Sequence, residues 1–171
     1  MTVRPKFLRY VLIPGALLMG EGASQATNAP STAEVLGGLH QSDVKEVQAG
    51  KIAQKNGQSE AVRDYGAMLV KDHTAADKKV GELATRESID LRAATPAPGA
   101  NDMGTMASGS DFDKKFAQEM LDDHRKDLAA VTGARNATSD PQLKKLLGDM
   151  IPTLEKHEAA AEKIIDSQAK K

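Results

Sequence analysis

Hydrophobic residues recur every three or four positions along most of the chain, the spacing of an amphipathic helix. The clearest stripe runs from Val62 to Leu83. Stripes of this kind predict helices at residues 32–56, 60–87, 111–132 and 141–168. No segment alternates polar and apolar residues as a half-buried strand does, so the sequence predicts an all-α protein.

The connections between these helices predict how they are arranged. The short turns at residues 57–59 and 133–140 favour two antiparallel hairpins. Residues 88–109, with Pro96 and Pro98, form a long loop, expected to be mobile, that can cross the bundle. We therefore expect one four-helix-bundle domain over residues 27–171, ferritin-like, with a long crossover between the second and third helices. A simple up-down-up-down bundle is the alternative.

The first 26 residues have the pattern of a signal peptide. Arg4, Lys6 and Arg9 precede an apolar run at residues 10–19, and small residues follow at 24–26. We expect an exported protein of the periplasm or cell envelope. An uncleaved membrane anchor is the alternative, but the run is shorter than the roughly 20 residues that a membrane span needs. No later segment is apolar enough, so we expect no membrane span in the mature chain.

Composition narrows the classes of function. Acidic and basic residues nearly cancel, with a net charge of −1, so no basic face predicts a nucleic-acid partner. The chain has no cysteine, which excludes disulfides and thiolate metal sites. It contains no Gly-x-Ser-x-Gly, phosphate-loop or His-Glu-x-x-His motif, so we expect no enzyme activity. The candidate partner is another protein of the cell envelope.

The predicted helices carry one histidine each, within or beside the apolar stripe: His40, His73, His124 and His157. Imidazole suits zinc, copper, iron and nickel, so one hypothesis is a divalent transition metal held between helices, with Glu46 as a further ligand. The alternative is that the histidines hydrogen-bond to one another and set the helix register. Counting residues places His73 and His124 at one height and His157 some 10 Å away. No Glu-x-x-His motif occurs, so a di-iron carboxylate site is not expected.

Two of these histidines directly follow an aspartate, in the pairs Asp72-His73 and Asp123-His124. Adjacent helical residues point about 100° apart, so both members of a pair cannot bind one ion. The aspartates are therefore expected to be outer partners of the histidines or solvent-facing charges.

Four stretches carry a resemblance: residues 46–53 (Glu-Val-Gln-Ala-Gly-Lys-Ile-Ala), 68–74, 120–124, and 151–154 followed by His157. Together they resemble an exported bacterial family called domain of unknown function 4142, whose members are often labelled outer membrane proteins. The resemblance implies a ferritin-like four-helix fold and export to the envelope, and it implies no established activity. His40 lies outside the general pattern of that family.

Two functions remain open at this point. The first is a non-catalytic envelope bundle with a structural or stress-related binding role. The second is a metal-binding bundle with an inter-helix histidine cluster. A b-type haem held by two histidines is a third hypothesis, which the small core disfavours.

Overall fold

A computed structural model describes residues 30–93 and 111–169 of the 171-residue chain. Within these ranges it contains no strand. The elements in chain order are α1 (Thr32–Asn56), α2 (Glu60–Arg86), the short 3-10 helix η1 (Leu91–Ala93), α3 (Phe112–Ala137) and α4 (Pro141–Gln168). The prediction of an all-α four-helix bundle is confirmed. The predicted signal peptide and residues 94–109 of the predicted loop lie outside the described residues.

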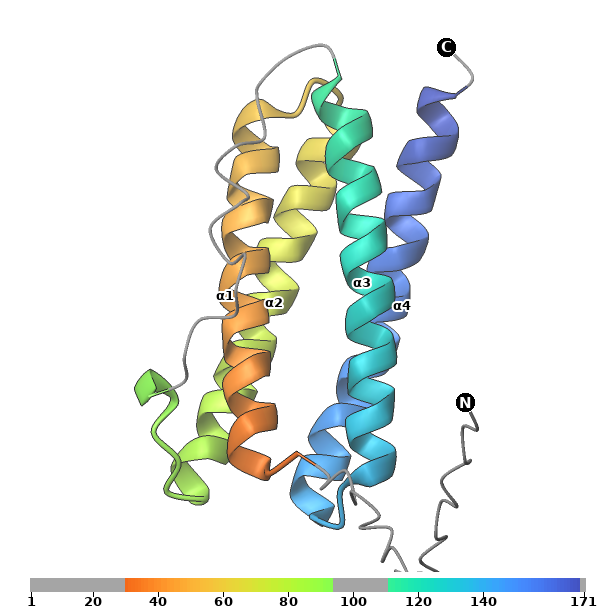
Figure 1. Cartoon of the computed structure of the whole chain (residues 1–171). Helices are drawn as coiled ribbons and strands as arrows, with labels where there is room; N and C mark the ends of the chain where they lie inside the picture. The colour runs from red at the N-terminus through yellow and green to blue at the C-terminus, as the bar shows by residue number, and fades with distance from the viewer. Residues whose placement is uncertain (1–29, 94–110, 170–171) are drawn as a thin grey trace, which may run out of the picture.

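The helix order is up-down-down-up. Figure 1 shows α1 and α4 running in one direction and α2 and α3 in the other. α1 packs mainly on α2, and α3 mainly on α4, so the molecule consists of two antiparallel hairpins. α2 ends at one end of the bundle and α3 begins at the other, which confirms the ferritin-like order with a crossover. The up-down-up-down alternative is wrong.

Side-chain caps fix the beginnings of three helices. Ser31 and Glu34 form a capping box at α1, and the Ser59 hydroxyl accepts the backbone N–H of Val62 at α2. Asp140 accepts two backbone N–H groups at the start of α4, where Pro141 occupies the first turn. These starts agree with the predicted ones.

α3 differs from the prediction at its C-terminal end. It continues to Ala137, five residues beyond the expected position 132. Gly133 lies inside the helix on its exposed side, where an added Cβ would have no neighbour within 4 Å. A glycine there costs about 1 kcal/mol relative to alanine, which is too little to end a helix that is packed along its other face.

Asp113 links the start of α3 to the turn of the other hairpin. Its buried carboxylate accepts the backbone N–H groups of Gln58 and Ser59, each at 2.8 Å. The carboxylate thus satisfies backbone donors of the α1–α2 turn and fixes the two hairpins relative to each other.

α1 and α2 approach closely at a pair of glycines. A Cβ built on Gly50 would lie 2.5 Å from the carbonyl oxygen of Gly66, and one built on Gly66 would lie 2.6 Å from the carbonyl oxygen of Gly50. Any side chain at either position would therefore push the helices apart. This close approach lets short side chains such as aspartate reach across the interface.

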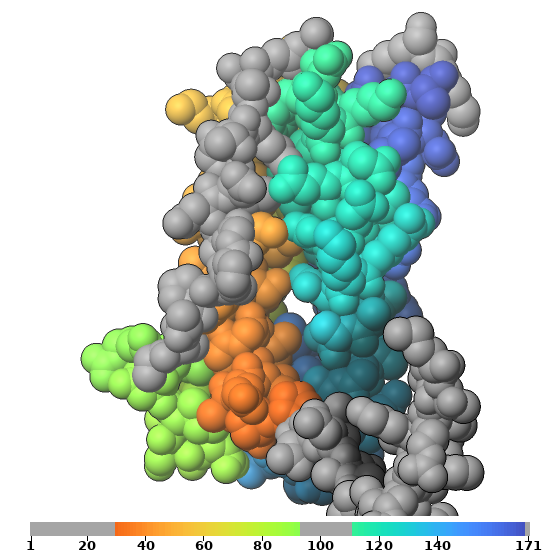
Figure 2. Space-filling model, viewed as in Figure 1, coloured from red at the N-terminus to blue at the C-terminus, as the bar shows by residue number. Residues whose placement is uncertain are grey.

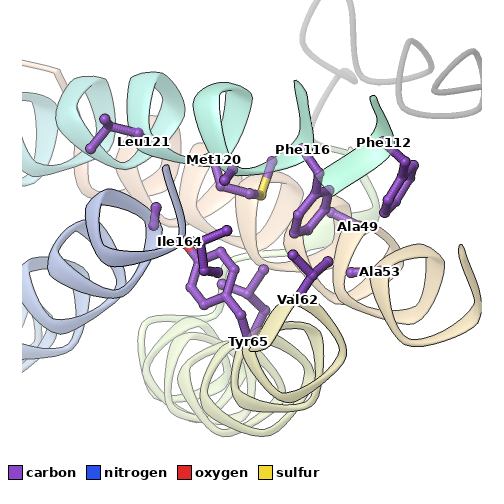
Figure 3. Packing of buried hydrophobic residues seen from close by; sticks show 12 residues of the cluster. Ala49, Ala53, Val62, Tyr65, Phe112, Phe116, Met120, Leu121 and Ile164 are labelled. Carbon is purple, nitrogen blue, oxygen red and sulfur yellow. The ribbon is translucent and has the colours of Figure 1, made fainter. Parts of the chain in front are cut away.

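The apolar core is divided into two clusters. Figure 3 shows side chains of the first core cluster, where helices of both hairpins meet; Tyr65 lies edge-on to Phe116, with ring centroids 6.1 Å apart. The first core cluster consists of Ala49, Ala53, Val62, Tyr65, Leu69, Phe112, Phe116, Ala117, Met120, Leu121, Ala161 and Ile164. The second core cluster consists of Leu36, Val80, Leu83, Ala84, Val131, Leu143, Leu146, Leu147, Met150 and Leu154. Along each of α2, α3 and α4, a buried histidine lies between the residues of the first core cluster and those of the second.

None of the helices described is long and apolar enough to cross a membrane.

Candidate metal centre

Three histidines from three helices meet in the layer between the core clusters. His73 on α2 is 4 % exposed, and His124 on α3 and His157 on α4 are fully buried. Their ring centroids lie 5.0–5.7 Å apart. One ring nitrogen from each lies within 4.8 Å of the others. The predicted approach of His73 and His124 is confirmed, and we call these three side chains the imidazole trio.

The predicted 10 Å offset of His157 is wrong, because it rested on a third helix ending at residue 132. The true end at Ala137 leaves His124 thirteen residues before the α3–α4 turn. His157 lies sixteen residues after Pro141 on the antiparallel helix. The difference of three residues is a height of roughly 4.5 Å, which side chains can span.

Hydrogen bonds fix the orientation of the two fully buried rings. Nδ1 of His124 lies 2.8 Å from the carbonyl oxygen of Met120, and a carbonyl only accepts, so Nδ1 carries the hydrogen. Nε2 of His157 lies 3.1 Å from the carboxylate of Asp72 and is the donor there. Although burial acts to raise it, the pKa of Asp72 is held below its usual range by hydrogen bonds from Lys156 and His157, so this carboxylate is an acceptor.

These two bonds leave two lone pairs facing each other. In the neutral rings the remaining nitrogens are Nε2 of His124 and Nδ1 of His157, which lie 3.1 Å apart. Two acceptors at that distance need a positive centre between them, either a proton or a metal ion. Four-coordinate zinc with Zn–N bonds of 2.0–2.1 Å places its ligand nitrogens roughly 3.3 Å apart. The observed spacing is therefore close to that of two ligands of one ion.

Protonation of this pair is disfavoured. Burial lowers the pKa of His157 to about 4, with the bond to Asp72 opposing the shift and the other two imidazoles adding to it. Burial also lowers the pKa of His124, more than its bond to the Met120 carbonyl raises it. At neutral pH both rings are thus neutral, the protonation state that binds metals.

His73 presents a third ring nitrogen. Its Nδ1 lies 2.8 Å from Oδ1 of Asp43, a residue only 2 % exposed, and donates to that carboxylate. Its Nε2 is buried and has no hydrogen-bond partner among the described residues. Burial lowers the pKa of His73, but the bond to Asp43 and the charge of Glu46 outweigh it and raise the pKa overall. A proton or another cation near His73 is therefore favoured.

Glu46 and Tyr65 lie beside the imidazole trio. Glu46 comes from α1, the helix that supplies no histidine to the trio, and it is 1 % exposed. Burial raises the pKa of Glu46 to about 7, against the charge of His73. Its Oε2 and the hydroxyl of Tyr65 are buried, and neither finds a hydrogen-bond partner within residues 30–93 and 111–169. The ring of Tyr65 packs edge-on to His157. Two unsatisfied oxygens here are costly, about 1–3 kcal/mol each, unless a further group pairs with them.

The fourth predicted histidine, His40, is not part of the trio. Its Nδ1 pairs with Asp77 on α2 at 2.6 Å, in a half-exposed position. Asp123 pairs with Lys45 and Lys126. Of the two aspartates that precede a histidine, only Asp72 contacts the trio, and it contacts His157 rather than its neighbour in sequence.

Asp43 was missed by the sequence analysis. It follows His40 by three positions and precedes Glu46 by three, which places all three near one face of α1. That spacing was the available signal, but an aspartate in a charged helix ordinarily faces solvent.

The fold and the site define an all-α bundle whose hydrophobic core is interrupted by a layer of three imidazoles, accompanied by the carboxyl groups of Asp43, Glu46 and Asp72. Residues 18–164 match the sequence family described as Domain of unknown function (DUF4142), and the chain belongs to that family. Neither the curated proteins nor the solved structures contain a significant match.

Proposed function

We propose that this protein binds one divalent transition-metal ion through His73, His124 and His157. The observation that carries the proposal is the 3.1 Å distance between Nε2 of His124 and Nδ1 of His157, two nitrogens whose rings each donate their other N–H to an oxygen acceptor. The partner groups agree with it, because metal-binding imidazoles commonly donate their other N–H to a carboxylate or a backbone carbonyl. Here His73 donates to Asp43, His124 to the Met120 carbonyl and His157 to Asp72.

Three imidazoles favour zinc, copper or nickel over magnesium or calcium, which prefer oxygen ligands. A tetrahedral ion would keep one position for a fourth ligand. Glu46, Tyr65 and Asp43 are nearby groups that each have a buried oxygen without a partner among the described residues. We propose Glu46 and Tyr65, which make no other side-chain hydrogen bond there, as the groups that bind the ion or a water molecule held on it. Because divalent charge favours the ionised carboxylate, binding would shift the pKa of Glu46 back toward its ordinary range.

The place of action that we propose is the cell envelope, which rests on the signal-like pattern of residues 1–26. A role in holding or buffering a metal ion needs no catalytic group, and it agrees with the absence of a catalytic motif in the sequence.

The test is metal analysis of untagged protein. Protein stripped with a chelator is incubated with zinc or cobalt, passed through a desalting column and analysed for bound metal. We expect one ion per chain, and for cobalt a visible spectrum typical of tetrahedral coordination. We expect the His73→Ala/His124→Ala double variant to retain none and His40→Ala to retain a full equivalent.

Failure of the double variant to fold would not decide the question, so the cobalt spectrum of the wild-type chain is the second measurement. Wild-type protein that folds, keeps no ion and gives only the spectrum of aqueous cobalt would show that the trio serves as a hydrogen-bonded packing layer.

A further inference from the structure

A cleft runs along the surface between α1 and α3, with α4 behind it. Figure 2 shows the surface hollowed between these two helices. The cleft has a volume of about 340 Å³ and extends along α1 from Glu34 to Asp43. Nine residues of helix correspond to roughly 13 Å, so the cleft is elongated along the bundle axis. Its volume lies within the usual range of small-molecule sites, roughly 300–1,000 Å³.

The walls of the cleft are mainly hydrophobic. Its principal apolar lining comes from three helices: Val35, Leu39, Val131, Leu147, Met150 and Leu154. Part of its width comes from Gly38, where an added Cβ would meet no atom within 4 Å. An apolar body of a ligand would therefore find both contact surface and space.

Acidic side chains predominate among the titratable residues of the cleft. Glu34, Asp43 and Asp127 line it together with His73, and no lysine or arginine of the described part of the chain does so. Asp127 and Asp43 lie at the end next to His73, where Asp127 accepts a hydrogen bond from Ser42 at 3.0 Å. The second oxygen of Asp43 is buried and has no partner among residues 30–93 and 111–169. A cation at this end would pair with Asp127 and with the second oxygen of Asp43, whose first oxygen already accepts from His73, in a partly desolvated place.

We infer that the cleft between α1 and α3 binds a small elongated molecule with an apolar body and a protonated amine, the amine lying at the Asp127–Asp43 end. The hydrophobic walls provide affinity and the carboxylates select the charge of the head group. This inference does not depend on a metal ion, because the cleft is formed by the chain alone.

The test compares three straight-chain compounds of eight carbons in chelator-treated protein at neutral pH: octylammonium, octanol and octanoate. Binding is measured by isothermal titration calorimetry. We expect octylammonium to bind one molecule per chain, about tenfold or more tighter than octanoate, because a hydrogen bond to a charged group contributes about 1.5–3 kcal/mol.

Two variants locate the site. Gly38→Leu fills the cleft and is expected to weaken octylammonium binding at least about tenfold. Gly133→Leu is the matched control, since it adds the same side chain to an open helical glycine on the exposed side of α3, outside the cleft, and should change nothing. Asp127→Asn keeps an acceptor for Ser42 and should remove the preference for the ammonium while leaving octanol binding unchanged.

Equal binding of octanoate and octylammonium would overturn the inference. So would binding that Gly38→Leu leaves intact, or no binding of octylammonium up to its solubility limit. Circular dichroism of both glycine variants establishes that they fold, which is expected because leucine is the better helix former.

Discussion

Two histidine–aspartate pairs lie on neighbouring turns of the same helix interface and have different environments. His40 on α1 pairs with Asp77 on α2 at 2.6 Å, and His73 on α2 pairs with Asp43 on α1 at 2.8 Å. The side chains of the first pair are 34 % and 31 % exposed, those of the second 5 % and 2 %. The residue types and the distances are nearly the same, so burial is the main difference between them.

Burial changes what each pair can do. The half-exposed pair is surrounded by a high dielectric, and water can satisfy its remaining polar atoms. In the buried pair, Nε2 of His73 and one oxygen of Asp43 are left without partners among the described residues. The half-exposed His40–Asp77 pair therefore has no unmet need for a ligand. The buried His73–Asp43 pair, one turn away, is part of a candidate binding site.

The largest difference that we expect between the buried and the half-exposed histidine–aspartate pair is in their contribution to stability. Asp43→Ala should lower the free energy of unfolding by about 3–5 kcal/mol, because it leaves a buried imidazole without its partner. Asp77→Ala should lower it by no more than about 1 kcal/mol. Urea unfolding of chelator-treated protein at pH 7, followed by circular dichroism, measures both. Equal losses in the two variants would mean that burial does not distinguish the pairs.

A second difference is expected in the pH dependence of stability. The pKa of His157 falls from 6.5 to about 4 on folding, so the unfolded chain binds more protons between these values. This group therefore destabilises the fold by roughly 3 kcal/mol as the pH falls from 6.5 to 4. The pKa of Glu46 rises from 4.5 to about 7, which destabilises the fold by a similar amount as the pH rises through that window.

These two contributions have opposite signs, and Glu46→Gln removes one of them. The variant should gain up to roughly 3 kcal/mol of stability over wild type at pH 8, and little at pH 4. Its stability should then fall more steeply with acidification than that of wild type. Urea unfolding at several pH values tests this. A Glu46→Gln profile parallel to wild type would contradict the assignment.

A smaller difference is expected in metal affinity. Asp43→Asn keeps an acceptor for Nδ1 of His73 but removes the negative charge, and it should weaken zinc binding about 10- to 100-fold. Asp77→Asn, the same change at the half-exposed pair, should have no effect. Competition with a chromophoric chelator gives both constants. An equal response of the two variants would exclude a specific role of Asp43.

The sequence predicted the position of a residue along the bundle axis better than it predicted the direction in which its side chain points around the helix. Counting residues along the predicted helices placed His73 and His124 together correctly. The same counting failed for His157, because an exposed Gly133 was taken as the end of α3 and each misplaced residue shifts the height by about 1.5 Å.

The direction of the side chain was harder to predict for His40 and Asp43. Three residues apart on a helix, they differ in direction by only about 60°, yet His40 lies at the half-exposed edge of the interface and Asp43 inside it. That difference depends on how α1 and α2 pack against each other and against α3, a tertiary property that hydrophobic periodicity does not contain. The role of the Met120 carbonyl could not be predicted either, since any helical residue offers one.

The imidazole trio takes one member from the α1–α2 hairpin and two from the α3–α4 hairpin. Neither half of the polypeptide holds the complete set, so the constellation exists only after the halves have docked. An ion with affinity for all three rings would bind the assembled chain and not its separate parts, and its binding energy would oppose their dissociation. Occupancy of the trio would thus stabilise the docked arrangement of the two hairpins.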